Sequence, residues 1–204
     1  GRQDTRLTCL DQQRGGTNIA ELFSGTGAGP DNAHSDGVIT KMTATFTPDE
    51  DRMFYATYSE GFRAGLLNRP GGQGPADGSY VIPYEVKTDE VTNYELGWKT
   101  TGLDGRLRFN GSAFFVEVEG LQTTIFDPAI VNLFFSDNAA DAEIKGLEGD
   151  VTWLPESIDG LTVAGAFSLL DTEITEKLVP TDDVAVGDEL AFAPAFQGNL
   201  RVRY

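Results

Sequence analysis

The sequence is short of cysteine and of basic residues, and each shortage argues against a class of protein. The one cysteine, Cys9, cannot form an internal disulfide, so we expect either a free thiol or a partner upstream of Gly1. Lys and Arg number 15 against 32 Asp and Glu, which gives 204 residues a formal net charge of -17. So acidic a chain repels phosphate groups, and a nucleic-acid partner is therefore not expected.

Long apolar runs are also missing, so the sequence predicts no transmembrane helix. A β-strand needs only about 9–11 residues to cross a bilayer, and its alternating character escapes hydropathy windows, so this absence does not exclude a membrane. Apolar residues make up 40% of the chain and aromatic residues 10%, which argues against disorder. The N-terminus has neither an initiator Met nor an apolar signal core, which indicates a processed chain or a fragment.

The residues that catalysis requires are scarce too. The single histidine, His34, stands beside Ser35 and Asp36 in a glycine-rich stretch, and neighbours in a loop do not form a catalytic triad. The acidic groups at 49–51 and 182–189 lack the ligand spacing of an EF-hand. We interpret them as acidic residues of a turn and of a solvated loop. The sequence therefore predicts no enzyme, no metal site and no cofactor.

What the chain does contain is apolar–polar alternation with a period of two, which is typical of β-strands. Helical periodicity is absent over any comparable length. The alternation predicts an all-β, antiparallel fold of about seven strands, although the faces of 52–63 stay unassigned because aromatic residues occupy both parities. Residues 1–37 are predicted to be a loop region with room for one short strand. The alternating segments are 38–46, 52–63, 92–99, 106–115, 147–153, 161–169 and 196–204.

The connections between these segments alternate strictly in length. Outer-membrane barrels have short periplasmic turns and long extracellular loops, so the alternation predicts an antiparallel transmembrane β-barrel segment. Trp98 and Trp153 are predicted at the turn-side ends of their strands, as in an interfacial aromatic girdle. A soluble β-sandwich is the alternative, but it explains only the alternation of side chains. The short connections are 47–51, 102–105 and 155–160, and the long ones are Ala64–Lys87, Asp127–Ala140 and Thr175–Glu189.

The charged residues of these segments fall on one parity, which we assign to the barrel lumen. A Lys or Arg on the lipid side would cost about 2–4 kcal/mol at the bilayer midplane. We expect most of these charges to be scaffold, pairing with one another or with water. The predicted lumen-facing residues are Glu95, Lys99, Arg106, Arg108, Glu148, Asp150, Arg201 and Arg203.

Several segments, taken in order, resemble the barrel of TonB-dependent outer-membrane receptors. Tyr55–Gly65 is similar to their strand-to-loop signature, and the strands that follow match in sequence and spacing from about Val38 to Tyr204. The further similar segments are Asn93–Lys99, Gly111–Phe115, Glu143–Glu148, Gly160–Phe167, Ala191–Pro194 and Asn199–Tyr204. The resemblance implies a 22-stranded barrel with a plugged lumen, of which residues 38–204 supply about a third. It also implies that the plug domain, the TonB-contacting segment and the C-terminal strands lie outside this chain.

The same resemblance implies a function: TonB-dependent import of a scarce nutrient across the outer membrane of a Gram-negative bacterium. A ferric siderophore or another iron chelate is the commonest cargo of that family, and cobalamin, haem, oligosaccharides and aromatic compounds are others. The implied partners are the TonB complex, outer-membrane lipid and the nutrient. The alternative is a secreted β-sandwich used for adhesion or carbohydrate binding.

Ligand contacts are expected at the mouth of the long loops. Arg63 stands where a strand leaves for the longest loop, and it could meet an anionic ligand. A structural ion pair is the favoured alternative for Arg63, because the Gly-Phe-Arg pattern around it looks general to the family. The expected ligand-contacting residues are Arg63, Asn68, Arg69, Asp127 and Asn132.

Overall fold

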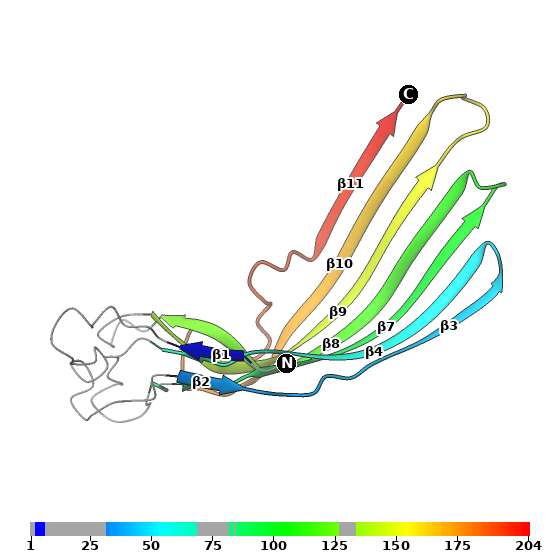
Figure 1. Cartoon of the computed structure of the whole chain (residues 1–204). Helices are drawn as coiled ribbons and strands as arrows, with labels where there is room; N and C mark the ends of the chain where they lie inside the picture. Colours follow the sequence, from blue (N-terminus) through cyan, green and yellow to red (C-terminus); the bar gives the residue numbers. More distant parts are fainter. Residues whose placement is uncertain (1–2, 7–31, 69–81, 84, 127–133) are drawn as a thin grey trace, which may run out of the picture.

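The computed structural model describes residues 3–6, 32–68, 82–83, 85–126 and 134–204. Its main feature is a single antiparallel sheet of seven strands in the order β11-β10-β9-β8-β7-β4-β3 (Figure 1). No helix in the described part of the chain is long and apolar enough to cross a membrane. The sheet confirms the all-β prediction and its strand number. Its strands are β3 (Lys41–Asp49), β4 (Arg52–Arg63), β7 (Asp89–Gly102), β8 (Leu107–Phe126), β9 (Phe134–Trp153), β10 (Thr162–Lys177) and β11 (Phe196–Arg203).

Two pairs of short strands lie outside this sheet. β1 (Gln3–Arg6) pairs with β2 (Asn32–Ser35), and β5 (Leu66–Leu67) pairs with β6 (Glu85–Val86). The N-terminal region therefore contains two short strands where the sequence left room for one. Strands of two to four residues are too short to display an alternating pattern, and this is why the sequence did not reveal them.

Short and long connections lie at opposite ends of the sheet. Figure 1 shows the tight β3–β4, β7–β8 and β9–β10 hairpins together at one end, and the strand ends that lead into the long connections at the other. One predicted loop is wrong over half its length, because β9 already begins at Phe134. Residues 136–140 are small or polar and so look like loop, but together with Phe134 and Phe135 they pair with an extension of β8. The connection between β10 and β11 likewise spans 178–195 in place of 175–189.

The strand register separates an apolar face from a polar face and assigns the faces of β4. Phe54 pairs with Trp98 and Ala56 with Leu96, which places these residues on the apolar face. Tyr55 is of the opposite parity and lies on the polar face. Trp153 is the last residue of β9, at the turn side as predicted, whereas Trp98 lies within β7 and not at its end.

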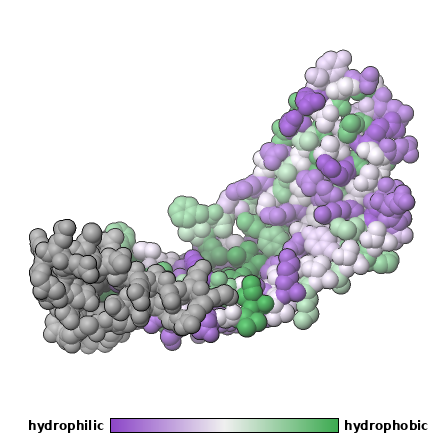
Figure 2. Space-filling view, viewed as in Figure 1, coloured by the Kyte–Doolittle hydropathy of each residue, from purple (hydrophilic) through white to green (hydrophobic). Residues whose placement is uncertain are grey.

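Most of the apolar face is uncovered, and Leu96 in its middle is 65% exposed. No second sheet packs against this face among the described residues, as a soluble β-sandwich would require. In the part of the chain that the structure describes, the compact core lies at the loop end, where the connection 178–195 folds onto β8, β9 and β10. Figure 2 shows hydrophobic side chains gathered near the place where this connection crosses the strands. The buried cluster consists of Ile125, Phe135, Ala139, Ala140, Ile174 and Val184.

Candidate functional site

The polar face carries the charges that the sequence assigned to the lumen. Lys99 pairs with Asn110, and Asn110 with Asp150, so these side chains lie on one face of three adjacent strands. The same register places seven of the eight predicted residues together. They are Glu95, Lys99, Arg108, Glu148, Asp150, Arg201 and Arg203.

Arg106 departs from this prediction. Gly102 pairs with Leu107, so β8 begins one residue after Arg106, which closes the turn from β7. Its Nη1 atom lies 3.0 Å from a carboxylate oxygen of Glu156, and its Nε atom donates a hydrogen bond of 3.0 Å to the Leu103 carbonyl. Arg106 therefore ties two turns together and does not belong to the charged strand face.

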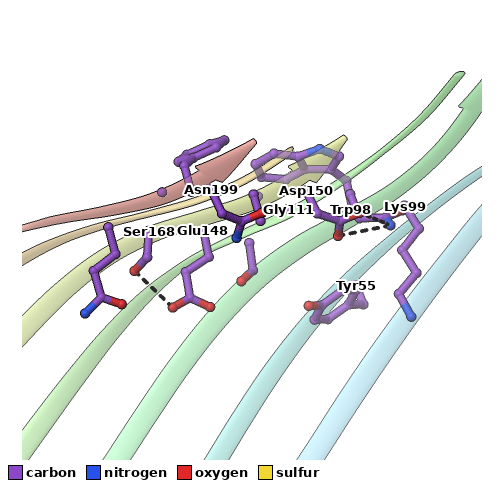
Figure 3. A pocket seen from close by; sticks show the side chains of 15 residues that line it. Tyr55, Trp98, Lys99, Gly111, Glu148, Asp150, Ser168 and Asn199 are labelled. Carbon is purple, nitrogen blue, oxygen red and sulfur yellow. Dashed lines mark hydrogen bonds between the residues drawn. The ribbon is translucent and has the colours of Figure 1, made fainter. Parts of the chain in front are cut away.

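A shallow hollow of about 570 Å³ lies on the polar face. It lies where Ser112, Ala166 and Ser168 carry small side chains, and some of its polar groups are hydrogen-bonded in pairs. Ser168 Oγ and Glu148 Oε1 are 3.2 Å apart, and Asn110 Nδ2 donates to Asp150 at 3.2 Å (Figure 3). Tyr55 Oη donates to Glu95 at 2.5 Å. The sequence did not predict Tyr55 as part of this surface, because only its pairing with Gly97 assigns its face.

At the loop end, a buried carboxylate organises the junction between strands and loops. Asp89 is 2% exposed and accepts hydrogen bonds from the Arg63 backbone N–H at 3.0 Å and from Arg63 Nε at 2.9 Å. Arg63 Nη2 also contacts Asp89 and donates to the Gln122 carbonyl at 3.0 Å. A carboxylate buried this deeply loses its hydration, and these hydrogen bonds and the ion pair offset that cost. Arg63 therefore forms a structural ion pair with Asp89, and its side chain is still 56% exposed.

Gln122 completes the junction. Its Nε2 atom donates to the carbonyls of Lys87 at 2.8 Å and Ala64 at 3.1 Å, and its backbone N–H donates to Asp89 at 3.3 Å. Both ends of the longest loop are thereby held to β8. Neither Asp89, at the start of β7, nor Gln122, inside β8, was predicted, because a single polar residue in a strand gives no sequence signal of its burial.

Asn68 also has a structural role. Its Nδ2 atom donates to the carbonyls of Pro83 and Ser136, each at 2.7 Å, and its Oδ1 atom accepts from the Ser136 N–H at 2.8 Å. Both amide protons are used and the residue is 7% exposed, so the Asn68 side chain serves to hold the loop against β9. The other expected contacts, Arg69, Asp127 and Asn132, lie outside the described residues.

The acidic turns make local contacts. Arg52 Nε donates to Asp49 Oδ2 at 2.8 Å, and this hydrogen bond holds the pKa of Asp49 below its ordinary value. Asp188 accepts a hydrogen bond of 2.9 Å from the Ala185 N–H. Within the described ranges, no three His, Cys, Asp or Glu side chains are grouped so as to hold a metal ion.

Comparison with known proteins identifies the class to which this sheet belongs. A model of the TonB-dependent receptor-like β-barrel matches residues 12–204, and the chain belongs to this family. The seven-stranded sheet is thus a segment of an antiparallel transmembrane β-barrel.

Individual relatives agree with this placement. The ferric yersiniabactin uptake receptor FyuA of Yersinia pestis superposes with a TM-score of 0.60 and 15% identity, over 84% of this chain and 23% of FyuA. The siderophore receptor PiuA of Acinetobacter baumannii superposes with a TM-score of 0.57 and 20% identity, over 83% of this chain and 24% of PiuA. The metal-pseudopaline receptor CntO of Pseudomonas aeruginosa is 27% identical over 126 residues, which are 62% of this chain and 16% of CntO. The chain therefore spans about a quarter or less of each relative.

Proposed function

We propose that this chain is part of an outer-membrane receptor that imports a metal chelate, most simply a ferric siderophore or another iron chelate. Family membership is the observation that carries the proposal. The names of the relatives support the cargo, since FyuA takes up ferric yersiniabactin and CntO is a metal-pseudopaline receptor. The proposed setting is the outer membrane of a Gram-negative bacterium, with the TonB complex as the partner that supplies energy. We assign no catalytic role and no cofactor to the chain.

In this proposal the long connections bind the chelate, and the ends of the strands beneath them hold these connections in place. The long connections, with Arg69, Asp127 and Asn132, form the mouth that meets the chelate. The junction of Arg63, Asp89 and Gln122 fixes where the longest loop leaves the barrel. The exposed edge of the Arg63 guanidinium is available to an anionic ligand, because Nε and Nη2 are the atoms that Asp89 holds.

The proposed lumen side is the polar face. Its charged side chains and its hollow suit a water-filled or plugged interior, because lipid would penalise them. Hydrogen bonds such as Ser168 with Glu148 satisfy part of the face, and the remaining groups are left for water or for another part of the receptor.

The test is uptake by the full-length receptor in a Gram-negative host that lacks its own siderophore receptors. Cells are supplied with ⁵⁵Fe bound to catecholate, hydroxamate or carboxylate siderophores. We expect accumulation of at least one chelate, and we expect it to disappear in a matched strain without TonB.

Two outcomes would contradict the proposal at different levels. TonB-dependent uptake of cobalamin or an oligosaccharide, with no iron uptake, would refute the cargo and leave the receptor role intact. Uptake that does not change when TonB is deleted would refute the receptor role itself.

A further inference from the structure

Three arginines gather on the polar face, close to the short turns. Arg108 pairs with Thr152 of β9, and Arg201 pairs with Ala164 of β10. Thr152 and Ala164 pair with each other, so the two arginines lie in one row, three strand spacings or about 14 Å apart. Arg203 lies two residues farther along β11 on the same face, and we call these three residues the arginine cluster.

The arginine cluster has no partner in the described part of the chain. The other arginines whose side chains are described, Arg52, Arg63 and Arg106, each contact a carboxylate. The three clustered side chains are exposed and make no ion pair and no side-chain hydrogen bond with the described residues. Their guanidinium N–H groups therefore remain available to an anion, in a chain whose formal net charge is -17.

The charge of the polar face changes sign along the strands. Toward the turns, the register places Glu95 first, then Glu148, and then Lys99 in the row of Asp150. The arginine cluster follows in the next rows. The three carboxylates accept hydrogen bonds from uncharged side chains, which leave their charge in place. A small anion on this face is therefore repelled in the middle of the sheet and attracted at its turn end.

The hollow of the polar face offers space beside the arginine cluster. Its lining residues Asn110 and Asn199 lie in the row next to the first two arginines. Its volume of about 570 Å³ falls in the range of small-molecule sites, which is about 300–1,000 Å³. Between these arginines the row carries Thr152 and Ala164, whose short side chains leave the floor open. A chelate of ordinary size therefore has room to reach the guanidinium groups.

We propose that the arginine cluster is a transit site for metal chelates of net negative charge, such as ferric carboxylates and catecholates. Guanidinium groups suit these ligands because their paired N–H donors match two adjacent oxygens. Family membership turns the polar face to the lumen and the short turns to the periplasm, so the cluster lies where the chelate leaves the barrel. The proposal rests on the proposed import function and adds the charge of the cargo and its last contact with these strands.

The first experiment measures the electrostatic potential beside the cluster and does not depend on import. In an otherwise cysteine-free full-length receptor, a fluorophore is attached to Thr162→Cys, opposite Arg203, or to Ser168→Cys, opposite Glu148. After correction for the free dye, iodide should quench the first label about threefold more than caesium does, since a potential of about one kT changes the local ion concentration by this factor. The order should reverse at the second label.

The variants test whether the arginines are the source of this potential. In R108Q/R201Q/R203Q the preference of the first label for iodide should disappear, whereas R108K/R201K/R203K should keep it. Arg52→Gln is the matched control, since Arg52 lies at the β3–β4 turn and is already paired with Asp49. A thermal melt by circular dichroism establishes that each variant is folded.

The second experiment measures ⁵⁵Fe uptake by cells that make the full-length receptor. The probes are ferric enterobactin, an anionic catecholate chelate, and ferrichrome, an uncharged hydroxamate chelate. In R108Q/R201Q/R203Q we expect the maximal rate for ferric enterobactin to fall several-fold, with KM unchanged because the loops make the first contact. Ferrichrome uptake should not change.

Equal quenching of the first label by iodide and caesium in the wild type would overturn the proposal. So would import of ferrichrome alone, or an unchanged rate for ferric enterobactin in R108Q/R201Q/R203Q. An equal loss of both chelates in that variant would also overturn it, because it would indicate a purely structural role. If the receptor imports neither chelate, the uptake result bears on the proposed function alone, and the quenching measurements decide on the cluster.

Discussion

Gly111 and Gly97 lie beneath aromatic rings that cross from the neighbouring strand. A Cβ atom at Gly111 would meet the Trp98 ring and would come within 2.8 Å of the Glu148 carbonyl oxygen. A Cβ atom at Gly97 would meet the Tyr55 ring. Glycine is required at these positions because the ring occupies the space of the missing side chain, and the contact fixes the register of both strands.

We expect Gly111→Val to destabilise the receptor by about 1–3 kcal/mol, the usual cost of overpacking. Thermal unfolding of the full-length protein in detergent measures the change. Gly102→Val is the matched control, since a Cβ atom there meets nothing within 4 Å. Equal melting temperatures for the two variants would contradict this account of the glycine.

Asp89→Asn tests the ion pair between Asp89 and Arg63. The substitution keeps the shape of the side chain but removes the charge that Arg63 neutralises, so we expect a loss of about 1–3 kcal/mol, typical of hydrogen bonds to charged groups. The loop 64–88 should become more sensitive to protease. Glu90→Gln, at the next and exposed position, is the control. If both variants resist protease as the wild type does, the junction does not hold the loop.

Among the elements, the β7–β8 turn is unusual because three consecutive residues have left-handed backbones. Leu103, Asp104 and Gly105 have φ values of 54°, 52° and 84°. Glycine and, to a lesser degree, Asn and Asp adopt this conformation readily, whereas Leu does so at a cost of about 1–2 kcal/mol.

Leu103→Asn should therefore stabilise the protein, by up to about 1 kcal/mol. Chemical denaturation of the full-length receptor, followed by tryptophan fluorescence, gives the difference. Leu154→Asn serves as control, because Leu154 is an exposed turn-side leucine that is not among the positive-φ residues. A Leu103→Asn variant no more stable than this control would show that the turn carries no strain.

The β3–β4 hairpin has a pH-dependent contact at its turn. Since Arg52 lowers the folded-state pKa of Asp49, the contact stabilises the hairpin above the unfolded pKa of about 3.9. The stabilisation disappears as the pH falls through the lower folded value. Melting temperatures of wild type and Asp49→Asn should accordingly differ at pH 6 and converge toward pH 2. A difference that persists at pH 2 would contradict this sign.

For the whole molecule, alternation and connection lengths were enough to predict the sheet, its strand number and the face of most charges. They failed where tertiary pairing decides the outcome. Residues 136–140 of β9 have weak β-propensity, and they are part of the strand because β8 extends beside them. Asn68 looked like a loop residue free to bind, but its amide replaces backbone partners at the edge of β9. Burial of Asp89 likewise depends on residues 26 and 33 positions away.

The packed cluster at the loop end has an immunological consequence. Val184 is buried in it, and the Ile174 backbone exchanges hydrogen bonds of 2.8 Å with Asp188 and Gly187, so the connection 178–195 has one defined shape. Antibodies raised against the folded receptor at this surface should recognise a discontinuous epitope shared with β8 and β9. They should fail to bind a synthetic peptide of residues 178–195. A vaccine that presents this loop therefore has to display it on its strands.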